Sequence, residues 1–110
     1  MAKNKITQKE AIFYQLYKAF RETPGEYIPV FKFMGEVHCV ELGLWGFVSH
    51  ECSARASEMR KDNPALVEVT EIVGKSGARF YGYRLTPTAR PEMIQDSALL
   101  AFYNKIRQGV

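Results

Sequence analysis

Apolar residues recur at helical spacing near the start of the chain. At about 100° per residue, the apolar face of residues 8–22 holds Ile12, Phe13, Leu16, Tyr17 and Phe20. The opposite face holds Tyr14, Lys18 and Arg21. Thr7 and Glu10 have the Thr-x-x-Glu spacing of a capping box, and Pro24 and Gly25 cannot continue a helix. The pattern therefore predicts an amphipathic helix over residues 8–22.

The pattern after this helix fits more than one structure. Residues 26–29 read as a short extended piece, in which Pro29 suits an edge position or a helix start. The apolar residues that follow are spaced as on a helix face: Val30, Phe33, Met34, Val37 and Val40. Residues 36–40 also fit a strand, and Gly35 disfavours a helix by about 1 kcal/mol relative to Ala. We expect a helix from residue 30 to at least 36, and leave open whether residues 30–48 form one helix or a helix and a strand.

A further helix is predicted over residues 50–62, with Ser49 as N-cap and Pro64 beyond its end. Its inward positions are Cys52, Ala56 and Met59. Its outward positions are His50, Ser53, Ala54, Ser57 and Lys61. Arg55 and Arg60 fall on the two borders between these faces.

Two alternating stretches rich in β-branched and aromatic residues predict strands over residues 66–73 and 79–85. Between them, Gly74-Lys75-Ser76-Gly77 predicts a hairpin turn, because two of its residues tolerate positive φ. The expected inward face of the hairpin holds Val67, Val69, Tyr81, Tyr83 and Leu85.

The C-terminal residues 86–110 predict a linker followed by a helix over residues 92–107, which Pro91 starts. Its apolar residues are spread around the wheel: Met93, Ile94, Ala98, Leu99, Leu100, Phe102, Tyr103 and Ile106. A helix that is apolar on most sides is buried against something. It therefore packs either on the first helix or on a second subunit, and we predict a homodimer formed through this helix.

The run from Ser53 to Lys61, followed by a strand, a Gly-rich turn and Tyr83-Arg84-Leu85, resembles the recognition helix and wing of winged helix–turn–helix proteins of phage and bacterial type. The resemblance implies an α+β fold in which residues 1–85, basic N-terminal arm included, form a three-helix core with a β-hairpin wing. Residues 86–110 would add the C-terminal helix. One feature departs from the motif: the six residues 43–48 separate the two candidate helices, where three or four are usual.

The resemblance implies that the chain binds double-stranded DNA, sequence-specifically or as an architectural protein, and is a small transcriptional regulator. A recognition helix presents its outward face to the major groove, and a compact basic turn can reach a minor groove or a phosphate. The expected contacts on the helix are Ser49, His50, Ser53, Ala54, Arg55, Ser57, Arg60 and Lys61, and those on the wing are Lys75, Ser76 and Arg79. For Arg55, ion pairs with Glu51 and Glu58 are the alternative, because these lie four and three residues away.

The charge of the chain permits binding to a polyanion without requiring it. The net charge is +3, from 15 Lys and Arg against 12 Asp and Glu. Lys3, Lys5 and Lys9 make a basic N-terminal segment that can add phosphate contacts. Residues 49–85 carry six cations and five anions, a balance of only +1. This balance favours the alternative function, a winged-helix module for protein–protein interaction without nucleic acid, unless the cations gather on one face.

Other classes of function are disfavoured. His38, Cys39, His50 and Cys52 are zinc-ligand types, but their spacing does not match the usual pairs, and two cysteines make no disulfide framework. No Gly-rich phosphate loop follows a strand and no serine lies in a nucleophile elbow, so we expect no enzyme, cofactor or small-molecule ligand. No apolar run approaches the roughly 18 residues of a membrane span. We expect a cytoplasmic protein, in the host cytoplasm if it is viral.

Overall fold

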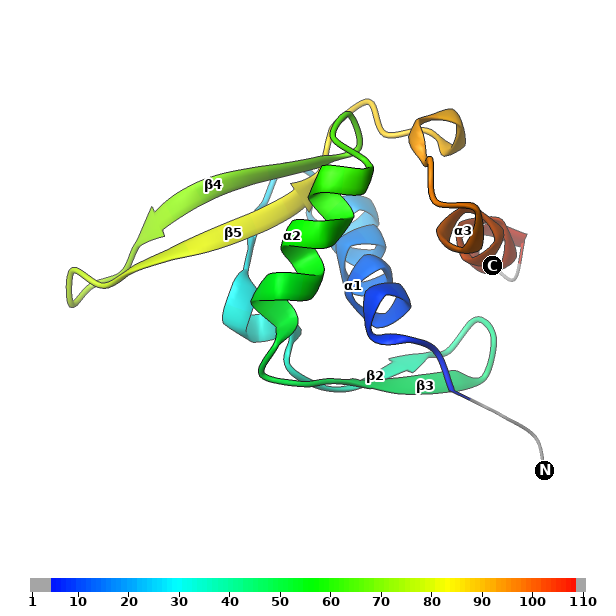
Figure 1. Cartoon of the computed structure of the whole chain (residues 1–110), viewed down its shortest axis with the longest axis horizontal. Coiled ribbons are helices and arrows are strands. Elements are labelled where there is room, and N and C mark those ends of the chain that lie inside the picture. The colour runs from blue at the N-terminus through cyan, green and yellow to red at the C-terminus, as the bar shows by residue number, and fades with distance from the viewer. Residues whose placement is uncertain (1–4, 109–110) are drawn as a thin grey trace.

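The first helix, α1 (Gln8–Glu22), begins where the capping box predicts. The Thr7 hydroxyl accepts a hydrogen bond from the Glu10 N–H at 3.1 Å, and the Glu10 carboxylate accepts one from the Thr7 N–H at 2.9 Å. The computed structural model describes residues 5–108, and α1 lies at the centre of the molecule (Figure 1). Its buried residues are Ala11, Ile12, Phe13, Tyr14, Leu16 and Tyr17. Tyr14, expected on the opposite face from the apolar residues, is therefore part of the core.

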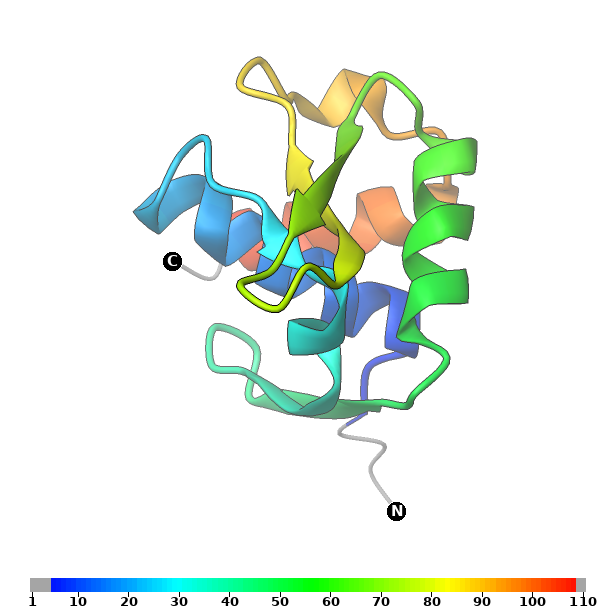
Figure 2. The same cartoon turned by 90° about the vertical axis from the view of Figure 1, so that its left-hand side faces the viewer.

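Three strands form an antiparallel sheet in the order β1-β5-β4: β1 (Ile28–Pro29), β4 (Val67–Val73) and β5 (Arg79–Leu85). The predicted hairpin of β4 and β5 is confirmed, and its turn is closed by the Gly77 N–H, which donates to the Gly74 carbonyl at 3.0 Å. Gly77 has a φ of +87°, which a residue with a side chain rarely adopts. The hairpin extends well beyond the rest of the molecule (Figures 1 and 2).

The expected helix from residue 30 to at least 36 is wrong beyond residue 33. A short 3-10 turn, η1 (Val30–Phe33), is followed by a two-stranded antiparallel sheet of β2 (Gly35–Cys39) and β3 (Leu44–Val48). Gly35 has a φ of +113°, which ends the helical turn, and the residues after it alternate between buried and exposed. Within residues 5–108, this β-hairpin thus stands where the second helix of a three-helix core was expected.

The β2–β3 hairpin is attached to α1 and to the segment before it. The Ile6 N–H, before α1, donates to the Trp45 carbonyl at 2.8 Å, and a Cβ on Gly46 would lie 2.7 Å from the Ile6 side chain. In α1 itself, the Tyr14 hydroxyl donates to the carboxylate of Glu41, in the turn of the hairpin, at 2.6 Å. Burial raises the pKa of Tyr14 far above its ordinary value, and the bond to Glu41 acts in the same direction.

The helix expected over residues 50–62 is present as α2 (Cys52–Asp62), with its first residue two positions later. Its inward residues Cys52, Ala56 and Met59 are buried, as predicted. The N-cap position falls on Glu51 and not on Ser49. Ser49 instead bonds to α1, because its N–H and its hydroxyl both donate to the Gln8 side-chain oxygen at 3.1 Å.

The C-terminal segment forms a 3-10 turn, η2 (Pro91–Met93), and then α3 (Ser97–Gln108), so the helix expected over 92–107 is interrupted. The Asp96 carboxylate accepts the N–H groups of Ala98 and Leu99 and thereby fixes the new helix start. α3 packs on α1, where the Phe13 ring meets Phe102 and Tyr103 edge to face at 6.4 and 5.6 Å. The buried residues of α3 belong to the same core as those of α1, and the fold is α+β.

A buried asparagine joins the end of α2 to the segment before α3. The Asn63 side chain is 1% exposed. Its amide nitrogen donates to the Met59 carbonyl at 3.0 Å, and its oxygen accepts the Gln95 N–H at 2.7 Å. Its backbone carbonyl also accepts the N–H groups of Leu66 and Val67, at the start of β4. Asn63 therefore joins the end of α2, the start of β4 and the segment before α3.

Replacement of Asn63 by alanine is expected to lower the free energy of unfolding by about 2 kcal/mol, because the Gln95 N–H loses its acceptor inside the protein. Urea denaturation followed by circular dichroism measures the change. The control is Asn104→Ala, since Asn104 makes only an exposed bond to Arg107 and should change stability by less than about 0.5 kcal/mol. Equal losses in the two variants would contradict the role given to Asn63.

Candidate nucleic-acid interface

The expected DNA-contacting residues of α2 and of the loop before it are mostly accessible. His50, Ser53, Ala54, Arg60 and Lys61 are exposed, whereas Ser57 is half-buried. Ser49 is half-buried and its hydroxyl is already bonded to Gln8. The structure therefore leaves most of the predicted helix face open, and uses Ser49 to attach the loop to α1.

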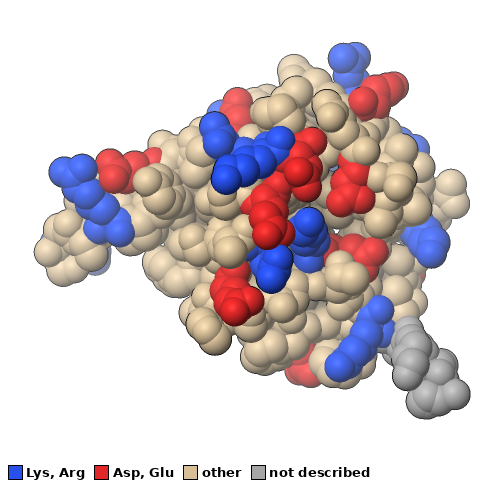
Figure 3. Space-filling model, viewed as in Figure 1, with Lys and Arg blue, Asp and Glu red and all other residues tan. Residues whose placement is uncertain are grey.

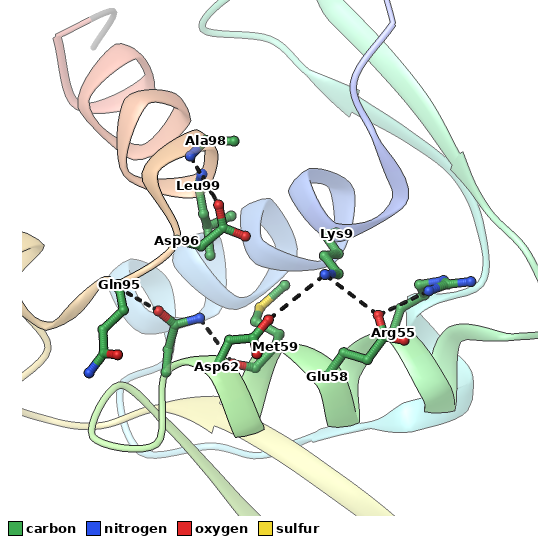
Figure 4. Close-up of polar contacts among 10 residues, drawn as sticks. Lys9, Arg55, Glu58, Met59, Asp62, Gln95, Asp96, Ala98 and Leu99 are labelled. Carbon is green, nitrogen blue, oxygen red and sulfur yellow. Dashed lines mark hydrogen bonds and ion pairs between the residues drawn. The ribbon is translucent and has the colours of Figure 1, made fainter.

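The carboxylates of α2 and of its N-cap lie together on one flank of the helix. Glu51, Glu58 and Asp62 fall within about 40° of one another on the helical wheel. This flank faces the start of α1, because the Lys9 ammonium lies 3.5 Å from the Glu58 carboxylate and 3.9 Å from that of Asp62 (Figure 4).

Arg55 belongs to the same flank as these carboxylates. Its guanidinium donates to Glu58 at 2.9 Å and lies 3.6 Å from Glu51, so the ion pairs considered from the sequence are present. The hydrogen bond from Arg55, followed by the charges of Arg55 and Lys9, holds the pKa of Glu58 below its ordinary value. Arg55 is thus engaged within the protein.

The opposite flank of α2 carries Ser53, Ser57 and Arg60 and faces the β4–β5 hairpin. Arg60 lies close enough to Tyr83 on β5 for its charge to act on the tyrosine: burial raises the pKa of Tyr83, and the guanidinium opposes this rise. The helical positions on this flank include no carboxylate. Although the charges of residues 49–85 nearly balance, the carboxylates of α2 and its N-cap lie on one flank of the helix and Arg60 lies on the other.

The far end of the β4–β5 hairpin carries cations as well. Lys75 and Ser76 are exposed in the turn, and Arg79 on β5 pairs with Glu71 on β4 at 3.3 Å. Blue atoms lie at this end of the molecule with red atoms beside them, and blue and red atoms also alternate over the middle of the same view (Figure 3). Across residues 5–108, Arg60, Lys61 and Lys75 are in no ion pair with a carboxylate.

The hairpin, η1 and α2 border one side of the molecule. Seen from that side, the hairpin points toward the viewer, with α2 beside it and η1 below it (Figure 2). The exposed Lys32 of η1 is not part of this surface, because it lines a hollow with α1 and β2, where Glu22 and Glu36 also lie. The structure thus brings together most of the predicted residues of α2 and of the hairpin on neighbouring surfaces.

The basic N-terminal segment is used largely within the protein. The Lys5 ammonium lies 4.9 Å from the centre of the Trp45 ring, and Lys9 pairs with α2. Lys3 lies outside the described residues. Lys9 is therefore already paired within the protein and is not free to make the phosphate contact that was expected of this segment.

Two exposed apolar residues on the hairpin were missed. Tyr81 is 54% exposed although its alternation with Tyr83 predicts an inward position, and Val73 is 59% exposed. A signal was available, because Glu71 and Arg79 occupy the same face as Tyr81 and Val73. Charged residues at inward positions indicate that this half of the hairpin has left the core.

Other chemistry has little support in the described part of the chain. No group of three His, Cys, Asp or Glu side chains within residues 5–108 is placed to hold a metal ion. Cys39 and Cys52 are buried free thiols, and burial raises the pKa of Cys39. None of the helices described between residues 5 and 108 is long and apolar enough to cross a membrane.

Comparisons with models of protein families, with curated protein sequences and with solved structures found no match to this chain.

The ion pairs on the α1-facing flank of α2 can be tested by titration. Replacement of Arg55 by alanine should raise the pKa of Glu58 toward its ordinary value, as measured by NMR of the side-chain carboxyl. Because the folded pKa is lowered, the pair stabilises the fold above the unfolded pKa, and this contribution is lost as the pH falls through the folded one. Arg60→Ala, on the other flank, should leave the pKa of Glu58 nearly unchanged. A similar rise in both variants would refute the assignment of the flanks.

Proposed function

We propose that this protein binds double-stranded DNA as a winged helix, with α2 as the recognition helix and the β4–β5 hairpin as the wing. The order of elements supports this: a helix, a short strand, a recognition helix and a hairpin, with β1 added to the hairpin as its third strand. The β2–β3 hairpin takes the place of the second helix, and the proposal gives it the structural role of supporting α2. As the sequence suggested, the DNA-binding role would be that of a transcriptional regulator or an architectural protein.

The observation that carries the proposal is the segregation of charge on α2. Of the five carboxylates that weakened the case for DNA binding, the three of α2 and its N-cap lie on the flank that faces α1, where Lys9 and Arg55 pair with them. The other two, Glu68 and Glu71 of β4, pair with Arg84 and Arg79 of β5. The flank nearest the hairpin presents Ser53, Ser57 and Arg60. Small and hydroxyl-bearing residues let a helix approach base edges closely and bond to bases or phosphates.

The proposed interface therefore differs in part from the residues expected from sequence. It contains His50, Ser53, Ala54, Ser57, Arg60 and Lys61 on the helix side, and Lys75, Ser76 and Arg79 on the wing. Arg55 and Ser49 are left out, because both are bonded within the protein and only partly exposed. Arg79 is kept because its side chain stays 70% exposed although it is paired with Glu71.

A homodimer formed through the C-terminal helix stays a prediction. The large apolar residues of α3 are accounted for by α1, since Leu99, Phe102 and Ile106 are buried within one chain. Light scattering distinguishes a monomer of 12.6 kDa from a particle of twice that mass.

The alternative is a protein-interaction module without nucleic acid. It is favoured by the large apolar side chains that are exposed on the surface: Phe31, Met34, Val40, Phe47, Val73 and Tyr81. The two functions separate in one experiment, because only the first predicts salt-dependent binding to duplex DNA.

Fluorescence anisotropy with a mixed-sequence duplex of about 30 base pairs, across a salt series, tests the proposal. The wild-type protein should bind with micromolar affinity at low salt, and the affinity should fall steeply as salt rises. The double variant Arg60→Ala/Lys75→Ala removes one unpaired cation from each element. It should weaken binding and reduce the slope of log K against log salt by about 1.8, because each phosphate contact contributes about 0.9.

The matched control is Lys105→Ala/Arg107→Ala, which removes the same charge from α3. It should leave the slope nearly unchanged, because α3 lies on the side of α1 away from the wing (Figure 1). Equal effects of the two double variants would mean that only net charge matters. Absence of wild-type binding at low salt would exclude the proposed function and favour the interaction module.

A further inference from the structure

The β4–β5 hairpin exposes two apolar side chains between its base and its turn. Val73 and Tyr81 are 59% and 54% exposed, and no described element covers them. Both lie on the face of the hairpin that carries Tyr83 and Leu85, which are buried against the core. They therefore continue the inward face of the sheet into solvent.

This position is fixed relative to α2. Arg60 of α2 lies near Tyr83, and Tyr81 lies two residues farther along β5, about 7 Å at the rise of a strand. The turn with Lys75 lies about 20 Å from Val69, the cross-strand partner of Tyr83, by the same measure. Along the hairpin, Arg60 therefore lies beside the core, Tyr81 follows opposite Glu71, Val73 lies opposite Arg79, and Lys75 lies in the turn.

Next to its major groove, duplex DNA also presents charged groups with apolar groups between them. The centres of adjacent major and minor grooves are about 17 Å apart, half of a helical turn, and a sugar–phosphate strand separates them. That strand carries apolar C–H faces of deoxyribose between its charged phosphates. With α2 in the major groove, the middle of the hairpin lies over this strand and the turn reaches the groove beyond it.

We infer that Val73 and Tyr81 pack against the deoxyribose rings of the strand between the two grooves, while Lys75 and Arg79 contact its phosphates. This inference depends on the proposed function, and it adds a contact that does not depend on counterion release. The wing then contributes to affinity through phosphate contacts, which salt weakens, and through an apolar contact, which salt leaves intact.

The charges around the pair favour nucleic acid over a protein partner. Arg60 lies at the core side of the pair, Lys75 lies in the turn beyond it, and Arg79 lies directly opposite Val73. The carboxylate of Glu71, directly opposite Tyr81 on the same face, is paired with Arg79. Two side chains also make an apolar patch far smaller than a stable interface between protein chains requires, which is about 800 Å² on each partner.

The test uses the double variant Val73→Thr/Tyr81→Thr, which keeps β-branched residues in the strands while removing the apolar surface. The affinity for the mixed-sequence duplex should fall about tenfold at every salt concentration, with the salt slope unchanged. Tyr81→Phe should bind like the wild type, because the ring and not the hydroxyl makes the contact. The matched control is Val40→Thr, an exposed valine beyond the end of β2 that is 72% exposed, which should have no effect.

Thermal denaturation of each variant verifies that the fold is retained, as expected for exposed positions. Wild-type binding with an unchanged affinity in the Thr/Thr variant would overturn this inference alone. A reduced salt slope in that variant would also overturn it, because the pair would then act through the neighbouring cations. Light scattering gives a third outcome that would overturn the inference. If the wild-type protein is a dimer and the Thr/Thr variant has half its mass, the apolar pair contacts a second copy of the chain and not DNA. Failure of the wild type to bind any duplex would remove the proposed function as well.

Discussion

Burial of α1 on almost every side is the constraint on which the rest of the structure depends. Ile12, Phe13 and Leu16 are at most 1% exposed, and α2, α3, both sheets and the loop at Ser49 all contact this helix. An amphipathic helix needs one covering surface, but a helix with so many buried residues needs several. The other elements are arranged around α1, and their outer faces make the surface of the protein. The exposed flank of α2 is one of these outer faces.

The same arrangement separates the charges of α2. Because α2 packs on α1 through Cys52, Ala56 and Met59, one flank must face the start of α1 and the other the hairpin. Lys9 comes early in α1, where it meets the carboxylates of Glu58 and Asp62. Ion pairs on such an exposed surface contribute little to stability. Their effect in this protein is on the surface potential, since Lys9 and Arg55 offset two of the three negative charges of the acidic flank, while the helical positions of the other flank carry no carboxylate.

Local pattern was sufficient wherever an element shows one clear periodicity in its apolar residues. The bounds of α1, the β4–β5 hairpin and the inward residues of α2 were predicted for this reason. The segment from Val30 to Val48 was not, because its apolar spacing fits both a helix and a strand, and the choice is made by contacts with Ile6, Tyr14 and Gln8 that lie far away in the sequence. The alternation of Val37 and Cys39 with Glu36 and His38 was the signal that favoured the strand.

The site was predicted as a set of residues but not as a surface. Sequence placed Arg60, Lys61 and Lys75 in the interface, and they remain unpaired among the described residues, whereas Arg55 and Ser49 are bonded inside the protein. The difference between Arg55 and Arg60 is not one of residue type or helix position alone. It depends on which flank α1 covers, and that is a property of tertiary packing.

The exposure of Tyr81 also depends on tertiary packing. Period-2 alternation gave its face correctly, but where the core ends along the hairpin depends on how far α1 and α2 extend beneath it. Glu71 and Arg79 mark that limit, because neither charge would be placed on a buried face.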